Sequence, residues 1–194
     1  GKGHGLPHNP FKAIVAPRPI GWISTRAADG TPNLAPYSFF NAVSDTPPVV
    51  MFSSNGRKDS LEIAEATGEF VCNFVGETLF RAMSQTSFAY ERGMSEFEAA
   101  GLAEAECRIV KAPRVAEAPA ALECRVTEIR RVRGLSGETG NWMVFGEVVG
   151  VHVDDAMLTD GHFDLAKARP VTRLGYLDYG MAPEIVALSR PKHG

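Results

Sequence analysis

Residues 33–60, which read NLAPYSFFNAVSDTPPVVMFSSNGRKDS, restrict the fold more than any other part of the chain. The first third has the apolar and aromatic character of a strand, yet Pro36 lies inside it. Proline has no backbone N–H to donate to a neighbouring strand, so it is confined to sheet edges and bulges. We therefore expect residues 33–41 to form an irregular edge or a bulge, where backbone groups face something other than a neighbouring strand.

The second half of this stretch changes from an apolar strand to a polar turn and then to a helix. Residues 49–52 are a short apolar strand, and residues 53–60 contain hydroxyls and two cations. The following segment LEIAEATG has helical spacing, with Asp59 and Glu62 placed as a capping box and Gly68 as the stop. Such a helix N-terminus, beside cations and hydroxyls, is able to hold a phosphate. The alternative is an ordinary strand-to-helix loop with solvated charges.

The rest of the chain reads as further strands separated by turns and short helices. In residues 121–133, Leu122 and Cys124 alternate with Glu123 and Arg125, which predicts one apolar and one charged face. Further strands are predicted at residues 20–26, from 32 onward, at 69–75 in the centre of the sheet, at 108–111 and at 142–153. A turn is predicted at residues 27–30 and a flexible hairpin loop at 134–140. Short helices are predicted at 78–86 and at 164–167. Another helix is predicted to begin at a capping box formed by Ser95 and Glu98 and to end at Gly101. With about six strands and no alternation of strand and helix, the pattern favours a closed or nearly closed antiparallel barrel.

Some side chains have both a functional and a structural explanation. The aromatic residues Phe88, Tyr90 and Phe97 either cover a ligand or anchor a loop to the core. His152, on the strand at 142–153, is expected to be a structural histidine with a satisfied hydrogen bond. The five histidines have no metal-site spacing, so we predict no metal.

Composition and missing motifs exclude several classes of function. A net charge of −3 and a pI near 6.0 argue against a nucleic-acid partner. The three cysteines are far apart and are expected to be reduced thiols. No apolar run is long enough to span a membrane, and the first ten residues lack a signal-peptide core, so we expect a cytoplasmic protein of one domain. Rossmann, P-loop and nucleophile-elbow motifs do not occur, and no catalytic side chain is assigned.

A family resemblance adds to these inferences. The segments that carry it are APRPIGWISTRAADGTPNLAPYSFFNAVSDTPPVVMFS, GRKDS, TGEFVCNF, FEAAGL, ALECRV, FGEVVGVHVDD and RLGYLDY, in this order from Ala16 to Tyr179. Together they resemble the flavin reductase-like family of FMN-binding split barrels. The resemblance implies a mainly β fold, an antiparallel and Greek-key-like split β-barrel with short helical excursions, in a domain at residues 16–180. Residues 1–15 are then an N-terminal extension and residues 181–194 a C-terminal tail.

The same resemblance implies where FMN binds. Its ring and ribityl chain are expected along a segment that includes Pro36, and its phosphate is expected at the block around Lys58. The implied ring and ribityl contacts are Asn33, Leu34, Ala35, Pro36, Tyr37 and Ser38, with Arg18, Ser24 and Thr25 on the preceding strand and Arg173 and Tyr179 near the C-terminus. The implied phosphate contacts are Ser53, Ser54, Arg57, Lys58 and Ser60. Arg18 and Arg173 are alternatives for the positive charge beside the N1/O2 edge of the ring.

The resemblance also implies a function and partners. The resemblance implies a homodimer, the usual state in the family, with FMN at or near the subunit interface. Family members transfer electrons between NADH or NADPH and flavin, or use the bound FMN as an electron carrier. Three hypotheses stay open: an NAD(P)H:flavin oxidoreductase, one that supplies a monooxygenase partner included; an FMN electron-transfer protein without direct NAD(P)H use; and a non-catalytic split-barrel binding module. Gly140-Asn141-Trp142 stands where many reductases carry Gly-Asp-His, which leaves use of NADH open, and Tyr176 stands where relatives often have glycine.

Overall fold

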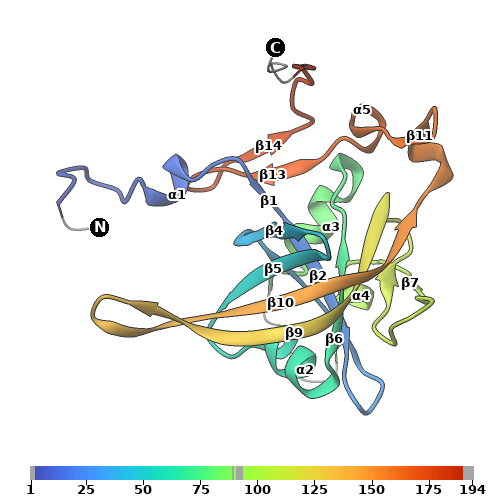
Figure 1. Ribbon diagram of the computed structural model, residues 1–194, viewed down its shortest axis with the longest axis horizontal. Helices are drawn as coiled ribbons and strands as arrows, with labels where there is room; N and C mark the ends of the chain where they lie inside the picture. The colour runs from blue at the N-terminus through green and yellow to red at the C-terminus, as the bar shows by residue number, and fades with distance from the viewer. Residues whose placement is uncertain (1–2, 89, 91–93, 190–194) are drawn as a thin grey trace.

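The computed structural model describes residues 3–88, 90 and 94–189 of the 194 (Figure 1). The expected excursion around residues 87–101, the N-terminal extension and the C-terminal tail therefore fall partly outside the described residues. The fold is built on a seven-stranded antiparallel sheet. Its strands, in spatial order, are β3 (Pro32–Tyr37), β2 (Gly21–Arg26), β6 (Glu69–Asn73), β9 (Ala120–Gly134), β10 (Gly137–Val153), β5 (Pro48–Asn55) and β4 (Phe40–Asp45).

Smaller elements surround this sheet. A three-stranded sheet consists of β1 (Arg18–Pro19), β13 (Val171–Arg173) and β14 (Tyr179–Met181). Two short hairpins are formed by β7 (Glu104–Ala105) with β8 (Arg114–Val115) and by β11 (Leu158–Thr159) with β12 (His162–Phe163). The helices are α1 (Phe11–Ile14), α2 (Asp59–Thr67), α3 (Phe80–Gln85), α4 (Glu96–Ala99) and α5 (Leu165–Ala168), with 3-10 turns η1 (Glu77–Leu79) and η2 (Asp155–Met157). None of the described helices has the length and apolar character needed to cross a membrane.

The two outer strands of the large sheet are consecutive in the chain and lie close together. β3 and β4 are joined by Ser38 and Phe39, and the backbone N–H of Ser53 in β5 donates to the carbonyl of Phe39 at 2.8 Å. The rings of Tyr37 and Phe52 pack with their centroids 4.8 Å apart. The sheet therefore curls until its first strand meets its last ones, as the predicted nearly closed barrel requires.

The structure places Pro36 on an edge strand. β3 pairs only with β2, and the register runs from Gly21 opposite Tyr37 to Arg26 opposite Pro32 without a shift. The predicted edge is thus confirmed, whereas a bulge within this pairing is not present. At an edge, the missing N–H of Pro36 removes no bond to a second strand, which is why a regular strand tolerates it.

Three clusters of apolar side chains fill the interior, and the smallest of them is formed around Val71 and Val110. One is centred on Trp22 and Phe97, and the Nε1–H of Trp22 donates to the hydroxyl of Thr86 at 2.9 Å. Another is centred on Phe52 and Phe70, whose rings meet edge to face. Phe97 is therefore a core residue, and of its two explanations the structural one is confirmed.

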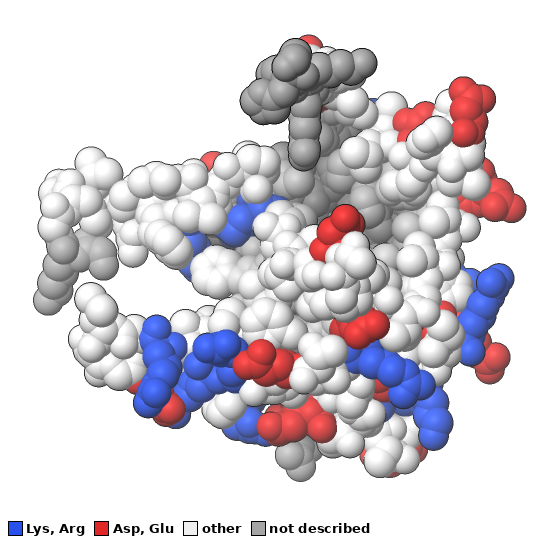
Figure 2. Space-filling view, viewed as in Figure 1, with Lys and Arg blue, Asp and Glu red and all other residues white. Residues whose placement is uncertain are grey.

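The long hairpin of β9 and β10 differs from the sequence prediction in the length of its loop. The hairpin predicted at residues 134–140 is confirmed, but its loop is shorter than predicted: β9 continues to Gly134 and β10 begins at Gly137, leaving a turn of Leu135 and Ser136. Gly137 has φ 113°, a backbone conformation that favours glycine. The hairpin projects from the body of the molecule, and charges of both signs alternate along its visible face (Figures 1 and 2).

The N-terminus of α2 also differs from its prediction. The capping box at Asp59 and Glu62 is wrong, since Lys58 occupies the N-cap position and its side chain accepts no backbone hydrogen bond. The predicted end is confirmed, with Gly68 in the left-handed region at φ 73°. The cap at Ser95 is confirmed, because its hydroxyl accepts from the backbone N–H of Phe97 at 3.2 Å.

A buried carboxylate organises the loop before β8. Residues 108–111 form no strand, and that prediction is wrong; the N–H groups of Arg108, Ile109 and Val110 instead donate to Glu123 at 3.0, 2.7 and 2.8 Å. His152 Nε2 lies 2.6 Å from the same carboxylate, which confirms the prediction that His152 is a structural histidine with a satisfied hydrogen bond. Glu123 is 1% exposed, so its predicted place on a charged face is wrong. Four polar partners account for its burial.

These contacts also account for the pKa of Glu123. Burial acts to raise this pKa, but the hydrogen bonds from the loop N–H groups and from His152 outweigh burial and hold the pKa below its ordinary value. Cys107 lies in the same cluster, with its sulfur and the ligand atoms of Glu123 and His152 all within 4.8 Å of one another. Both oxygens of Glu123 already accept two bonds each, so the cluster is a hydrogen-bonded anchor.

Replacing this carboxylate tests its role in stability. Glu123→Gln is expected to lower the free energy of unfolding by about 2–4 kcal/mol at neutral pH, because an amide leaves buried N–H donors without acceptors. The folded pKa of Glu123 is depressed, so its contribution is present above the unfolded pKa of about 4.3 and is lost as pH falls through the folded pKa. Urea unfolding at pH 7 and at about pH 4 measures both effects.

The matched control is Glu128→Gln on the same strand, where the carboxylate is 53% exposed and pairs with Arg130 at 3.4 Å. Its effect should stay within about 0.5 kcal/mol. Equal losses for the two variants, or a loss for Glu123→Gln that does not shrink on acidification, would contradict the anchor.

Candidate functional site

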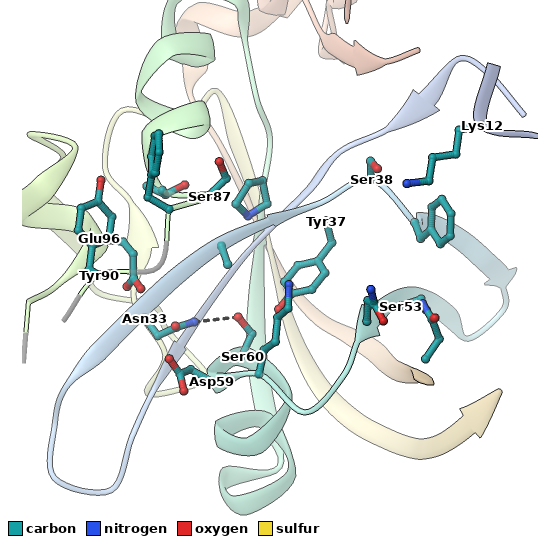
Figure 3. A pocket seen from close by; sticks show the side chains of 18 residues that line it. Lys12, Asn33, Tyr37, Ser38, Ser53, Asp59, Ser60, Ser87, Tyr90 and Glu96 are labelled. Carbon is teal, nitrogen blue, oxygen red and sulfur yellow. Dashed lines mark hydrogen bonds between the residues drawn. The ribbon is translucent and has the colours of Figure 1, made fainter. Parts of the chain in front are cut away.

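A large cavity lies where β3, β5 and the start of α2 meet the segment after α3. Its volume is about 730 Å³, within the range of cofactor pockets (Figure 3). The lining residues are Lys12, Asn33, Ala35, Pro36, Tyr37, Ser38, Phe39, Ser53, Asn55, Lys58, Asp59, Ser60, Thr86, Ser87, Phe88, Tyr90, Glu96 and Asn141. We call this space the first cavity.

One end of the first cavity is polar and faces the N-terminus of α2. Lys58 and Ser60 come from this helix start, and Ser53 and Asn55 come from the end of β5. No side chain caps the helix, so its first N–H groups and dipole are available to an anion. The Nδ2 of Asn33 donates to the hydroxyl of Ser60 at 2.8 Å and fixes its position (Figure 3). This end suits a phosphate.

The other end is lined by aromatic, proline and hydroxyl side chains, which suits an aromatic ring. Pro36, Tyr37, Ser38 and Phe39 form one wall, and residues 86–88 form the facing one. Burial raises the pKa of Tyr37, and hydrogen bonds with Ser60 and Ser54 oppose this only in part, so the phenol stays neutral at physiological pH. The edge position of β3 is what leaves these backbone groups free to face the cavity.

A carboxyl group from α4 stands on the same cavity wall. Glu96 accepts a hydrogen bond from the N–H of Leu34 at 3.1 Å. Burial raises its pKa, the hydrogen bonds from its own N–H and that of Leu34 lower it, and the charge of Asp59 raises it further. Glu96 therefore fixes α4 against β3 and takes up a proton more readily than a free carboxylate.

A second cavity of about 530 Å³ adjoins the first. Both are lined by Lys12, Pro36, Ser38 and Ser87, so the two spaces share a wall. The other residues around the second cavity are Asn9, Phe11, Arg18, Ile20, Met83, Ser84, Arg173, Tyr176 and Tyr179.

The sixteen residues implied by the sequence divide into three groups. Eight line the first cavity, namely Asn33, Ala35, Pro36, Tyr37, Ser38, Ser53, Lys58 and Ser60. Arg18, Arg173 and Tyr179 line the second, together with Pro36 and Ser38. The remaining five, Ser24, Thr25, Leu34, Ser54 and Arg57, line neither.

Local contacts explain why these five lie elsewhere. Ser24 bonds Pro113 and Asn73 in the interior, and Leu34 belongs to the Trp22 core cluster. Thr25, which is buried, and Ser54 lie behind the cavity: Thr25 accepts from Asn33 at 3.4 Å, and Ser54 donates to Gly56 at 2.9 Å. Arg57 pairs with Glu62 and Glu65 on α2, and its guanidinium lies 5.3 Å from the centre of the Trp142 ring.

Several lining residues lie outside the set implied by the sequence. Lys12, Thr86, Ser87, Glu96 and Asn141 come from segments far from β3 in the chain, and their side chains carry no shared motif. Phe88 and Tyr90 line the first cavity, and the hydroxyl of Tyr90 also donates to the carbonyl of Gln85 at 3.0 Å, so ligand cover and loop anchoring both stay open for this pair. The capping box at Ser95 was the one local signal near Glu96, because it located the helix that presents this carboxylate.

The sequence matches the family model described as "Flavin reductase like domain" over residues 15–176. The chain belongs to the flavin reductase-like family. A protein of Aquifex aeolicus (strain VF5) is 39% identical over 168 residues, which cover 84% of this chain and 83% of that protein.

Solved structures agree with the family assignment. Nitrilotriacetate monooxygenase component B from Bacillus cereus superposes with a TM-score of 0.87 at 27% identity, covering 97% of this chain and 96% of that one. A protein with a split barrel domain from Shewanella frigidimarina NCIMB 400 gives a TM-score of 0.83 at 26% identity, covering 93% and 90%. The predicted mainly β split-barrel fold is thus confirmed. Membership of this flavin reductase-like family makes the protein a flavin-related oxidoreductase with flavin as its cofactor.

Proposed function

We propose that this flavin reductase-like protein binds FMN in the first cavity and transfers electrons between NAD(P)H and flavin. The proposal rests on two features of one cavity: the uncapped N-terminus of α2, beside Lys58 and Ser60, and the wall formed by residues 36–39. The residues present fit FMN, because cationic and hydroxyl donors lie at one end and ring-sized walls at the other. When bound, FMN supplies the electron-accepting chemistry, and no protein side chain has to.

The side chains of the chain have distinct tasks in this proposal. Lys58, Ser60, Ser53 and the N-terminus of α2 hold the phosphate. The segment from Asn33 to Ser38 lies along the ring and ribityl chain, with backbone groups toward the polar ring edge. Thr25 and Ser54 act through others: Thr25 contacts Asn33, and Ser54 holds the turn before α2. Residues 86–88 exclude water from the facing side.

The nicotinamide nucleotide and the onward partner belong to the proposal as well. The similarity to a monooxygenase component supports delivery of reduced flavin to a monooxygenase partner. The second cavity beside the first supports a separate substrate, NADH or NADPH included. The alternatives remain an FMN electron-transfer protein without direct NAD(P)H use and a non-catalytic binding module. A cytoplasmic location and domain limits at residues 16 and 180 complete the proposal.

Colour and reduction distinguish these functions. The purified protein is expected to be yellow or to take up added FMN, and anaerobic NADH or NADPH is expected to bleach the flavin absorbance. Colourless protein that cannot take up FMN would leave only the binding module. FMN that neither nucleotide bleaches but dithionite does would leave the electron-transfer protein.

Two neighbouring cations just before α2, Arg57 and Lys58, allow the proposed phosphate contacts to be tested. Lys58→Ala is expected to weaken FMN binding by about tenfold or more, because a charge-assisted hydrogen bond contributes about 1.5–3 kcal/mol. Lys58→Ala with Ser60→Ala should weaken it further. Fluorescence titration of the apoprotein with FMN measures the affinity.

Arg57→Ala is the matched control, since Arg57 is a cation one residue away that pairs with Glu62 and Glu65 and lines neither cavity. Its FMN affinity should change less than threefold. An unchanged affinity in the Lys58 and Ser60 double variant would refute the assignment.

We also propose a homodimer. An apolar cavity of about 360 Å³ lies beside β6 and β10, and Val151 next to it is 60% exposed. β4 is the last strand in the order of the large sheet and is exposed except for Phe40, and its side away from β5 leaves a strand edge for a partner. Sedimentation should therefore find a dimer, and Val151→Asp should shift it toward monomer. A monomer of the unmodified protein at tens of micromolar would contradict the dimer.

A further inference from the structure

The second cavity is a separate binding space with a defined relation to the first. Its volume of about 530 Å³ is enough for a small organic molecule. Pro36 and Ser38, which border the ring end of the first cavity, also border this one. A molecule held here therefore lies beside whatever occupies the first cavity.

The charge around the second cavity is of one sign. Lys12, Arg18 and Arg173 line it, and none of its described lining residues is an aspartate or a glutamate. Figure 2 shows Lys and Arg atoms in the hollow under the N-terminal segment. A concave wall with cations alone attracts an anion and raises its local concentration.

Arg18 is the buried member of this group. It is 6% exposed, and its terminal nitrogens donate to the carbonyls of Lys12, Val15 and Leu174. Its Nε is buried without a hydrogen-bond partner among the described residues. Burial lowers the pKa of Arg18, and the positive charge of Arg173 lowers it further.

The charge of Arg18 therefore has little compensation within the described chain. Carbonyl dipoles and the ring of Phe39, 5.8 Å away, face its guanidinium, but the ion pairs of the described residues include no carboxylate bonded to it. A buried charge without a counter-ion is costly, and an anion in the cavity would remove that cost.

Two tyrosines, Tyr176 and Tyr179, line the second cavity beside Arg173. The guanidinium of Arg173 lies 4.3 Å from the centre of the Tyr179 ring, and it also donates to the carbonyl of Tyr176. Tyr176 has φ 54°, a conformation that a bulky side chain rarely adopts. Such strain is held where surrounding contacts enforce it, often at ligand sites. This aromatic lining suits a planar molecule.

We propose that the second cavity binds a small planar substrate that carries an oxyanion, either a carboxylate or a phosphate. Lys12 and Arg173 hold the oxyanion from the cavity wall, and Arg18 supplies the buried positive charge behind them. Tyr176 and Tyr179 flank the planar part, which lies toward Pro36 and Ser38. This substrate class rests on the proposed function, because electron exchange requires FMN in the first cavity.

Binding to the full chain, with and without FMN, tests the site independently of activity. Calorimetric titrations with benzoate and with neutral benzamide should show benzoate binding at least tenfold more tightly. Arg173→Gln and Lys12→Gln should each weaken benzoate by about tenfold, which corresponds to about 1.4 kcal/mol, and should leave benzamide unchanged. Titration with ADP distinguishes a carboxylate from a phosphate as the preferred oxyanion. If ADP binds more tightly than benzoate and its binding depends on Arg173 to the same degree, the preferred oxyanion is a phosphate.

Arg57→Gln is the control, because it removes a cation outside both cavities. Its anion affinity should match that of the unmodified protein. The proposal would be overturned if benzoate and benzamide bound equally well, or if neither benzoate nor ADP bound. It would also be overturned if anion binding survived both Arg173→Gln and Lys12→Gln. Anion binding without FMN uptake would overturn the proposed function but keep the site, and FMN uptake without anion binding would do the reverse.

Discussion

The closure of the sheet at the turn between β3 and β4 is the contact on which the rest of the structure depends. The bond from the N–H of Ser53 to the carbonyl of Phe39, with the packing of Tyr37 on Phe52, brings the first strand of the sheet against β5. This contact places the ring wall of the first cavity next to the phosphate end. Without the curl, the two halves of the site would lie on opposite edges of one sheet.

The edge position of β3 connects the fold to chemistry. An interior strand has both sides of its backbone occupied by neighbours, whereas β3 pairs with β2 alone. The unpaired side of β3 faces the first cavity, and Pro36 has no backbone N–H to offer there. The N-terminal segment and the loop after β13 then cover the far side of Pro36 and create the second cavity, with Arg18 bonded to carbonyls of both. The cavity proposed for flavin and the cavity proposed for an anion thus share one wall.

Local signals in the sequence predicted the parts of this arrangement that depend on neighbouring residues. Pro36 indicated an edge strand and Gly68 marked the end of α2, and both are confirmed, whereas the phosphate site at residues 53–60 stays a prediction. Predictions that depended on distant partners were less accurate. The sequence pattern placed Glu123 on a charged face, but the side chain is buried because N–H groups of residues 108–110 donate to it. No residue near Glu123 in the chain indicates these contacts. Arg57 and Lys58 look alike in sequence, yet Glu62 and Glu65 hold Arg57 outside the cavity.

The sequence by itself determined the strand-rich antiparallel class, the flavin reductase-like family and about half of the cavity lining, because these follow from backbone chemistry and contiguous motifs. Only the tertiary structure decided that Arg18, Arg173 and Tyr179 border a second cavity. It also decided that Lys12, Glu96 and Asn141 join the first. The physical reason is that such side chains meet through the curl and cover of the sheet. Contacts between segments that are far apart in the chain, such as Leu34 with Glu96 and Arg18 with Leu174, leave no periodic trace in the sequence.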